Sequence, residues 1–420
     1  MTAALAALNR RTFASLAHRN YRLYFAGQVV SVTGTWMQNI AMAWLVLDLT
    51  HSPVAVGLLA LCQFLPFTVF GLFAGVIVDR FDVRRLVIGT QAVSMVLAAA
   101  LAIPTLLGHV TPAFVYVLAA LRGTVLVLDA PSRQALTFRM VGPRELPNAV
   151  ALNSSLFNGA RVVGPALGGA VVALAGAGFC FAFNAVSFLA VLAGLLLMRT
   201  DELLPAERAE TRPRLLAGTR EAITYVRRTP QAGTVLILVA IVSTFAFNIN
   251  VLLPVLTKDT LDAGAATFGI ITGCFGGGAL IGALLSAALA RASMRIFLFG
   301  MTAFGLAELF LAPLRTAPAA GAMLFCLGLS FTLWTSNANS TLQLAAPGHL
   351  RGRVVGLYYY AFNGAGPAGG IISGWLASVG GTELAFAVGG GVTIVSVGVA
   401  ALRSSQLSPV RLAHLLSFKL

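Results

Sequence analysis

Residues 71–85 read GLFAGVIVDRFDVRR, and this stretch decides how the rest of the chain is interpreted. Its first eight residues are apolar and include Gly71 and Gly75, four positions apart. Residues at this spacing share one face of a helix, and small ones let a neighbouring helix approach closely. The next seven residues hold five charges. The change marks the point where an apolar helix leaves a membrane.

The same kind of apolar run recurs along the whole chain. Of the 420 residues, 58% are hydrophobic and only 10% are charged, whereas about a quarter of the residues in a soluble domain are charged. We count twelve runs of a length that can cross a bilayer core of about 30 Å. The sequence therefore predicts an all-α membrane protein with 12 transmembrane helices in two six-helix bundles.

One charged stretch divides these runs into two groups of six. Residues 199–230 hold seven arginines and five acids, and Leu215, Ile223 and Val226 recur there at helical spacing, which is typical of an amphipathic helix on a membrane surface. The predicted domains are an N-terminal bundle (1–198), a cytoplasmic linker (199–230), a C-terminal bundle (231–402) and a cytoplasmic tail (403–420).

The basic residues predict the orientation. Of the 28 lysines and arginines, 24 fall on the side of the termini and linker and two on the other side, while Arg122 and Arg161 lie within spans. Basic residues are enriched on the cytoplasmic side of membrane proteins. We expect a multi-pass membrane protein with both termini cytoplasmic. The net charge is +14, and the basic residues that produce it lie in the loops between the spans. We therefore expect a lipid bilayer as partner and no nucleic acid.

The two halves share landmarks. Residues 164–169 read GPALGG and residues 366–370 read GPAGG, in corresponding spans of the two halves. The opening stretch also returns in weakened form, with Gly71 matched by Gly282. Repeated halves are typical of transporters that bind their substrate between the halves, near the membrane midplane.

Several motifs together resemble one family. The spacing of Gly75, Asp79 and the arginines of 80–85 is similar to the gate motif of the major facilitator superfamily. Asp82, where glycine is usual, resembles the bacterial 12-span efflux branch related to enterobactin and macrolide exporters. The stretches DAPSRQA (129–135), LPNAVALN (146–153) and RGR (351–353) resemble that branch too.

This resemblance implies a gate at the cytoplasmic end of the molecule. An acid at the end of span two would face the start of span eleven, and a helix N-terminus attracts a carboxylate. The alternative is a solvated charge cluster. For Asp129, inside span four, we expect Arg84 or Arg85 as partner. The residues predicted to form this latch are Asp79, Arg80, Arg84, Arg85, Asp129, Arg351 and Arg353.

Few acids are placed to bind a proton within the membrane. Of the 14 acids, Asp48, Asp129 and Glu308 lie within predicted spans, and Asp48 and Glu308 are near the outer ends. A charge inside a bilayer is costly and needs a partner or a function. We therefore name Asp129 as the first proton-coupling candidate and Asp48 as the second, although Asp129 could instead belong to the latch alone.

Polar residues within spans predict the cavity wall. They fall on stripes of spans one, four, five, seven and ten, and a polar stripe faces other helices or water rather than lipid. The two mid-span arginines could hold an anionic or polar substrate, or tie neighbouring helices together. The predicted cavity residues are Gln28, Thr35, Gln38, Asn39, Arg122, Asn158, Arg161, Asn250, Trp334 and Asn337.

These features predict a transporter rather than an enzyme. The four cysteines lack metal-ligand spacing, and we expect no cofactor, no metal and a monomer. The expected activity is export of a small amphipathic molecule, a drug or siderophore-like product, with protons as the coupling ion. The alternatives are import of a metabolite or lysolipid, and a membrane sensor or scaffold that transports nothing.

Overall fold

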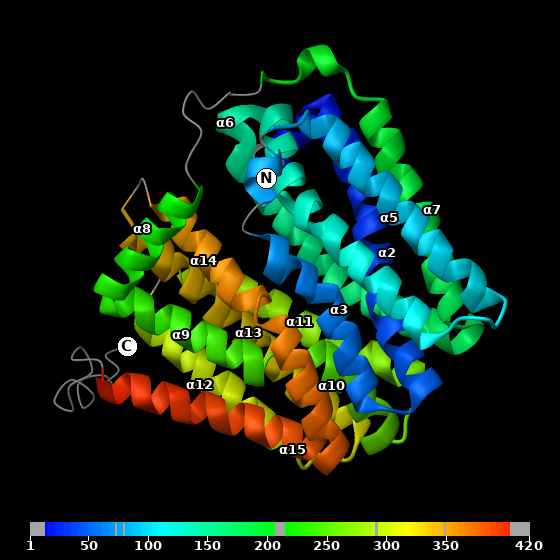
Figure 1. The fold of residues 1–420 in the computed structure, drawn as a ribbon, viewed down its shortest axis with the longest axis vertical. Helices are drawn as coiled ribbons and strands as arrows, with labels where there is room; N and C mark the ends of the chain where they lie inside the picture. The colour runs from blue at the N-terminus through cyan, green and yellow to red at the C-terminus, as the bar shows by residue number, and fades with distance from the viewer. Residues whose placement is uncertain are drawn as a thin grey trace, which may run out of the picture.

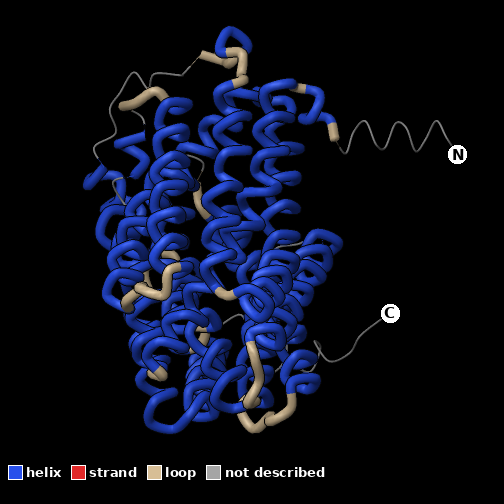
Figure 2. The backbone as a smooth tube through the Cα atoms, turned by 90° about the vertical axis from the view of Figure 1, so that its right-hand side faces the viewer, coloured by secondary structure: helices blue, strands red, loops and turns tan. Residues whose placement is uncertain are grey.

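The structure is a computed structural model that describes residues 13–71, 74–78, 80–205, 215–289, 293–347 and 350–403. Every regular element in these ranges is a helix, as predicted, and Figure 2 shows helices as nearly all of the described backbone. The helices of the first half are α2 (Arg19–Thr50), α3 (Pro53–Phe70), α4 (Ala74–Val78), α5 (Val83–Leu106), α6 (Pro112–Ala175) and α7 (Ala177–Leu196). Those that follow are α8 (Leu215–Arg228), α9 (Pro230–Phe245), α10 (Ile249–Val255), α11 (Ala265–Leu289), α12 (Met294–Leu311), α13 (Ala317–Ala345), α14 (Arg351–Asn363) and α15 (Gly366–Arg403). Short helical turns add η1 (Ala14–Ala17), η3 (Thr200–Glu202) and η4 (Leu256–Thr260).

These helices form two groups, which Figure 1 shows at an angle to each other. The described residues contain nine helical ranges long and apolar enough to cross a membrane, and α2, which carries the polar stripe, is not one of the nine. The 64-residue α6 is two helices joined at Gly142, and α15 is two joined at Gly380 and Gly381. Gly142 and Gly381 have φ of 72° and 67°, which glycine adopts without steric cost. The count of twelve spans stays a prediction.

The repeated glycine motifs form the contacts between the two halves. A Cβ on Gly169 of α6 would lie 2.6 Å from the Cα of Gly269 on α11, and one on Gly370 of α15 would lie 3.0 Å from the carbonyl oxygen of Gly57 on α3. Glycine at these positions lets the helix backbones touch. The motif predicted as a repeat is therefore an equivalent helix–helix contact on both sides of the molecule.

The two ends of the molecule differ in the helix termini and loops that lie there. At one end, here called the linker end, Arg19 at the start of α2 donates to the Leu197 carbonyl after α7, and Tyr225 of α8 donates to the Ala345 carbonyl at the end of α13. The loops after α2, α5 and α12 lie at the opposite end. The predicted domain boundaries stay predictions.

Candidate functional site

Two adjoining cavities lie along the first half of the chain. Their volumes are about 210 Å³ and about 180 Å³, and both are lined by Trp36 and Asn39 of α2 and by Arg122 and Leu126 of α6. The larger one continues to Asp129. We call the residues that line these two cavities the polar wall, because charged and amide side chains lie at its centre.

Asp129 is at the centre of a hydrogen-bonded network. It is only 4% exposed, and its carboxylate forms an ion pair of 2.9 Å with Arg133, one helical turn away. The Thr90 hydroxyl and the Gln91 amide donate to the same carboxylate at 2.7 and 2.8 Å. Arg133 in turn donates to Gln28 of α2 at 2.8 Å. Asp129 and Arg133 therefore neutralise each other between α2, α5 and α6.

The predicted partner of Asp129 was wrong. Arg84 donates to the Leu195 carbonyl at 2.8 and 3.1 Å, and the backbone amide of Arg85 donates to the carboxylate of Asp82, the N-cap of α5. Asp129 is too deep in α6 to meet either of them, and the arginine one turn along its own helix takes the pairing instead. A role for Asp129 in coupling or in the latch stays a prediction.

Arg122 has a neutral partner. Its guanidinium donates to Asn39 at 2.7 Å, and among the described residues it forms no ion pair. Asn39 lines both cavities, so this bond lies on the cavity surface. The charge of Arg122 is therefore left uncompensated on the polar wall.

Arg161 of α6 is the second uncompensated cation. Its guanidinium lies 5.3 Å from the ring of Trp36 in the first half and 5.9 Å from the ring of Phe331 in the second. Its Nε is buried without a hydrogen-bond partner. Cation–π contacts attract a guanidinium but do not neutralise it. A negative group entering beside Trp36 would meet both arginines.

The predicted stripe on α2 divides between the cavity and the neighbouring helices. Thr35 and Asn39 line the larger cavity, as predicted. Gln38 accepts a hydrogen bond of 2.6 Å from Asn184 of α7 and is buried, and its predicted place in the cavity stays a prediction. Gln28 reaches the site through Arg133. Asn158 is half-buried and is not among the residues that line either cavity.

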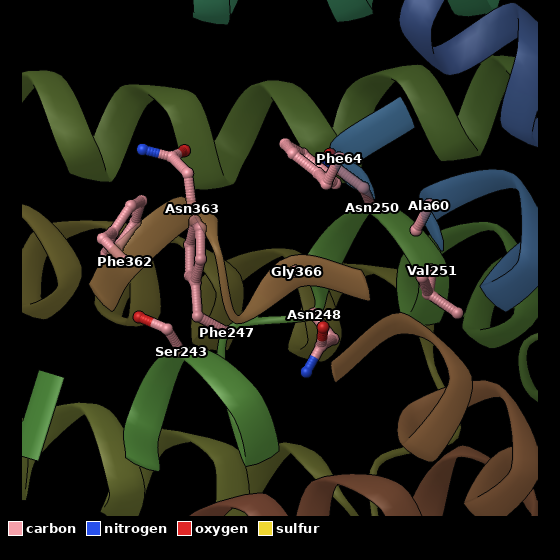
Figure 3. Close-up of a pocket in the computed structure, with 10 residues that line it drawn as sticks. All are labelled: Ala60, Phe64, Ser243, Phe247, Asn248, Asn250, Val251, Phe362, Asn363 and Gly366. Carbon is pink, nitrogen blue, oxygen red and sulfur yellow. The ribbon is translucent and has the colours of Figure 1, made fainter. Parts of the chain in front are cut away.

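The second half contributes a smaller cavity, of about 40 Å³. Figure 3 shows it between Phe247, Asn248 and Asn250 of the α9–α10 region and Gly366 of α15, with Phe64 of α3 at its edge. Asn250 also lines the 180 Å³ cavity of the first half. Asn250 therefore borders two of the cavities, and its role in substrate binding stays a prediction.

An aromatic cluster fills the second half beside this cavity. The ring of Phe331 stacks on Phe247 with centroids 4.2 Å apart, and it meets the ring of Trp334 edge-on at 5.8 Å. Phe304 and Phe362 complete the group. We call these five residues the aromatic wall. Trp334 is fully buried within it and lines none of the three cavities described above, and its part in a substrate cavity stays a prediction.

Asn337 is also a packing residue. Its amide donates to the Leu333 carbonyl at 2.8 Å and accepts from the amide of Ser293 at 3.3 Å. These bonds join α13 to the start of α12 and leave the side chain 5% exposed. A role for Asn337 in the substrate cavity stays a prediction.

The predicted latch is only partly within the described residues. Asp79 lies outside them. Arg353 at the start of α14 pairs with Glu221 of α8 at 2.7 Å, Arg84 binds carbonyls of α7, and Arg80 and Arg351 are exposed. Arg84 thus binds within its own half and Arg353 binds the linker helix. The latch stays a prediction.

A different ion pair joins the halves at the opposite end. Asp48 of α2 accepts from Lys258 of η4 at 2.6 Å, with side chains 60% and 25% exposed. Lys258 also lies 5.8 Å from the Trp44 ring, which stacks on Phe268 of α11. Asp48, predicted as a second proton site, is thus a contact between the halves, and its part in coupling stays a prediction.

Three residues of the site were missed from the sequence. Arg133 was quoted only as part of a motif, although its spacing from Asp129 is that of a helical ion pair. Thr90 and Gln91 carried no signal, because only the packing of α5 on α6 brings them to Asp129. Among the described residues no group of three or more His, Cys, Asp or Glu could hold a metal ion.

Comparison with known proteins identifies the family. The model described as "Transmembrane secretion effector" (MFS_3) matches residues 10–417. The chain is 27% identical to the staphyloferrin A transporter of Staphylococcus aureus over 68% of this chain and 72% of that protein. It is 28% identical to the multidrug efflux pump Tap of Mycolicibacterium fortuitum over 84% of this chain and 88% of that protein.

Solved structures agree with this assignment at the level of the fold. The nucleoside transporter NupG superposes with a TM-score of 0.70 at 13% identity, over 91% of this chain and 98% of that chain. The predicted fold class and the predicted resemblance are confirmed. The chain belongs to the transmembrane secretion effector family of the major facilitator superfamily, which consists of membrane transporters and not of enzymes.

Proposed function

We propose that this protein exports small amphipathic molecules that carry a negative group, of drug or siderophore-like chemistry, across the bacterial inner membrane. The observation that supports this best is a pair of uncompensated arginines, Arg122 on the polar wall and Arg161 against Trp36 of the same wall. Arg122 and Arg161 form no ion pair among the described residues, while the nearest acid, Asp129, is neutralised by Arg133. A carboxylate or catecholate would therefore find charge complementarity in the cavity.

The apolar part of such a molecule would lie against aromatic rings. Trp36 and Phe157 line the larger cavity, and Arg161 lies between Trp36 and Phe331 of the aromatic wall, at 5.3 and 5.9 Å from their rings. Ligand sites typically combine apolar walls with a few placed polar groups. One wall would orient the charge and the other would hold the rings.

The transport cycle that we propose is alternating access with proton antiport. The halves would rock about the glycine contacts between α6 and α11 and between α3 and α15, with the termini and linker in the cytoplasm and a monomer as the working unit. The efflux activity of the relative Tap supports the direction. The runner-up is import of a metabolite or lysolipid, and the third possibility is a sensor or scaffold on the same fold.

Transport in proteoliposomes with an imposed pH gradient tests this directly. The panel would contain anionic siderophores, neutral and cationic drugs, and a lysolipid. We expect anionic amphipathic compounds to move against their gradient when protons flow the other way. Movement in the direction of proton flow would favour import, and no movement of any compound would favour the sensor or scaffold.

A further inference from the structure

One acid of the second half has no counterpart in the site described above. Glu308 of α12 is 0% exposed, and neither of its carboxyl oxygens has a hydrogen-bond partner. A buried carboxylate without a partner is far more costly than a neutral carboxylic acid in the same place. The position calls for an explanation other than an ion pair.

The groups around Glu308 point to a proton. Its Oε2 lies 2.9 Å from the point that a Cβ on Gly389 of α15 would occupy, and the carbonyl oxygen of Phe245 lies 2.9 Å from that same point. Two oxygens that can only accept hydrogen bonds thus border the same space, which glycine leaves open. A proton on one of them turns repulsion into a hydrogen bond.

The Phe245 carbonyl is free because the helix breaks there. In a continuous helix the amide of Ile249 would donate to it, but α9 ends at Phe245 and α10 begins at Ile249. The amides of Phe247 and Asn248 donate within the turn, and no hydrogen bond from a described amide reaches the Phe245 carbonyl. A protonated carboxyl of Glu308 is placed to supply the missing donor.

The break is also part of the cavity. Ser243, Phe247, Asn248 and Asn250 line the 40 Å³ cavity in Figure 3. Phe304, one turn before Glu308 on α12, packs with its ring 6.5 Å from that of Phe247. The helix face that carries Glu308 therefore supports the segment that forms the cavity surface.

We propose that Glu308 is a proton-binding site in the second half, whose proton bridges α12 to the Phe245 carbonyl and sets the position of Phe247 and Asn250. When the proton passes to water, the carboxylate repels the carbonyl and the α9–α10 break must shift. The link from this shift to the transport cycle depends on the proposed function, whereas the proton site itself does not.

The surroundings of Glu308 isolate its titration from other groups. Helices α9 and α10 contain no ionisable side chain, and α13 contains only the thiol of Cys326. In α15, as far as Leu402, the one acid is Glu383, which pairs with Arg315 after the end of α12. Arg295 lies at the other end of α12, 13 residues from Glu308, or about 20 Å at 1.5 Å per residue.

Thermal unfolding across pH tests the proton site without any substrate. Wild type and Glu308→Gln, purified in nanodiscs, would be compared from pH 6 to pH 9, with Glu383→Gln as the control. A protein becomes less stable as pH rises if one of its acids is neutral in the folded state and ionises on unfolding. Its unfolding equilibrium constant then increases by about tenfold per pH unit. We expect Tm to fall with pH in wild type relative to Glu308→Gln. Parallel curves would overturn the proposal.

Cysteine labelling tests the link to the cavity. In a background without the four native cysteines, Asn250→Cys would be alkylated across pH with Glu308 intact or replaced by glutamine, and Thr35→Cys on the polar wall would be the control. We expect the pH profile at position 250 to change on replacement while that at position 35 does not. Identical profiles at position 250 would overturn the coupling, whichever direction of transport proves correct.

Discussion

The two halves of the molecule hold side chains of opposite chemistry. The polar wall of the first half holds Arg122, Asp129 and Arg133 in a network of amides and hydroxyls. The aromatic wall of the second half holds five stacked and edge-on rings around Phe331. Both halves use the same glycine motif to meet each other.

This difference indicates a division of labour within a repeated fold. The two halves share the backbone contacts of the repeat, but the side chains gathered within them are charged and polar in the first half and aromatic in the second. The acids follow the same division. Asp129 is bound by three side chains, those of Arg133, Thr90 and Gln91, whereas Glu308 is enclosed without any hydrogen-bond partner. Four substitutions test this contrast.

The largest effect is expected from Asp129→Asn. It leaves Arg133 buried without its anion, and breaking a buried pair costs about 3–5 kcal/mol. We expect lower stability and loss of transport. Adding Arg133→Gln should restore the stability, measured as Tm in nanodiscs. If pH-driven efflux returns along with stability in the double variant, Asp129 is structural and is not the proton site.

A smaller effect on stability but a strong one on binding is expected from Arg122→Gln. Hydrogen bonds to charged groups contribute about 1.5–3 kcal/mol, so affinity for an anionic compound should fall about 10- to 100-fold. Arg122→Lys keeps the charge and should fall less. An equal loss of affinity for a neutral compound of the same shape would show that Arg122 supports the structure of the polar wall and does not select for negative charge.

The aromatic wall should respond in a different way. Phe331→Leu removes the stacking on Phe247, and an aromatic pair contributes about 0.5–1.5 kcal/mol beyond burial. We expect weaker binding of ligands with large rings and little change in the preference for anions. A ligand panel measured by equilibrium binding checks this, and a lost anion preference would contradict the separation of roles.

The smallest effect is expected from Asp48→Asn at the opposite end. An exposed ion pair contributes about 0.2–1 kcal/mol, so Tm should hardly change. Because this pair joins the halves, the variant should increase alkylation of a cysteine at Thr35 from the opposite side of the membrane. Lys258→Gln should have the same effect. Unchanged labelling in both variants would show that this ion pair is not a gate contact.

Much of the fold could be predicted from the sequence, because hydropathy and glycine spacing are local signals. The helical runs, the linker helix and the repeat at 164–169 and 366–370 follow from composition and periodicity alone. Breaks at Gly142, at Gly380–Gly381 and between Phe245 and Ile249 are harder to place, because the residues on both sides remain apolar or helical.

The site could be predicted only in part. Helical spacing shows which residues share a face, but it does not show which helix that face meets. Gln38 and Asn39 are adjacent, yet one binds α7 and the other lines the cavity. Glu308 was set aside for its place near the end of a span, and only the packing of α9 and α15 shows how completely it is enclosed.

Binding of a matched pair of fluorescent probes tests the role of the polar wall most directly. Dansylglycine carries a carboxylate, and dansylglycinamide is its neutral equivalent of nearly the same shape. Energy transfer from tryptophan would be measured in nanodiscs for wild type and for the double variant Arg122→Gln/Arg161→Gln. We predict that wild type binds the carboxylate at least about tenfold more tightly, a difference of about 1.4 kcal/mol, and that the double variant loses this preference. Equal affinities in wild type, or a preference that survives both substitutions, would contradict an anion site between the two halves.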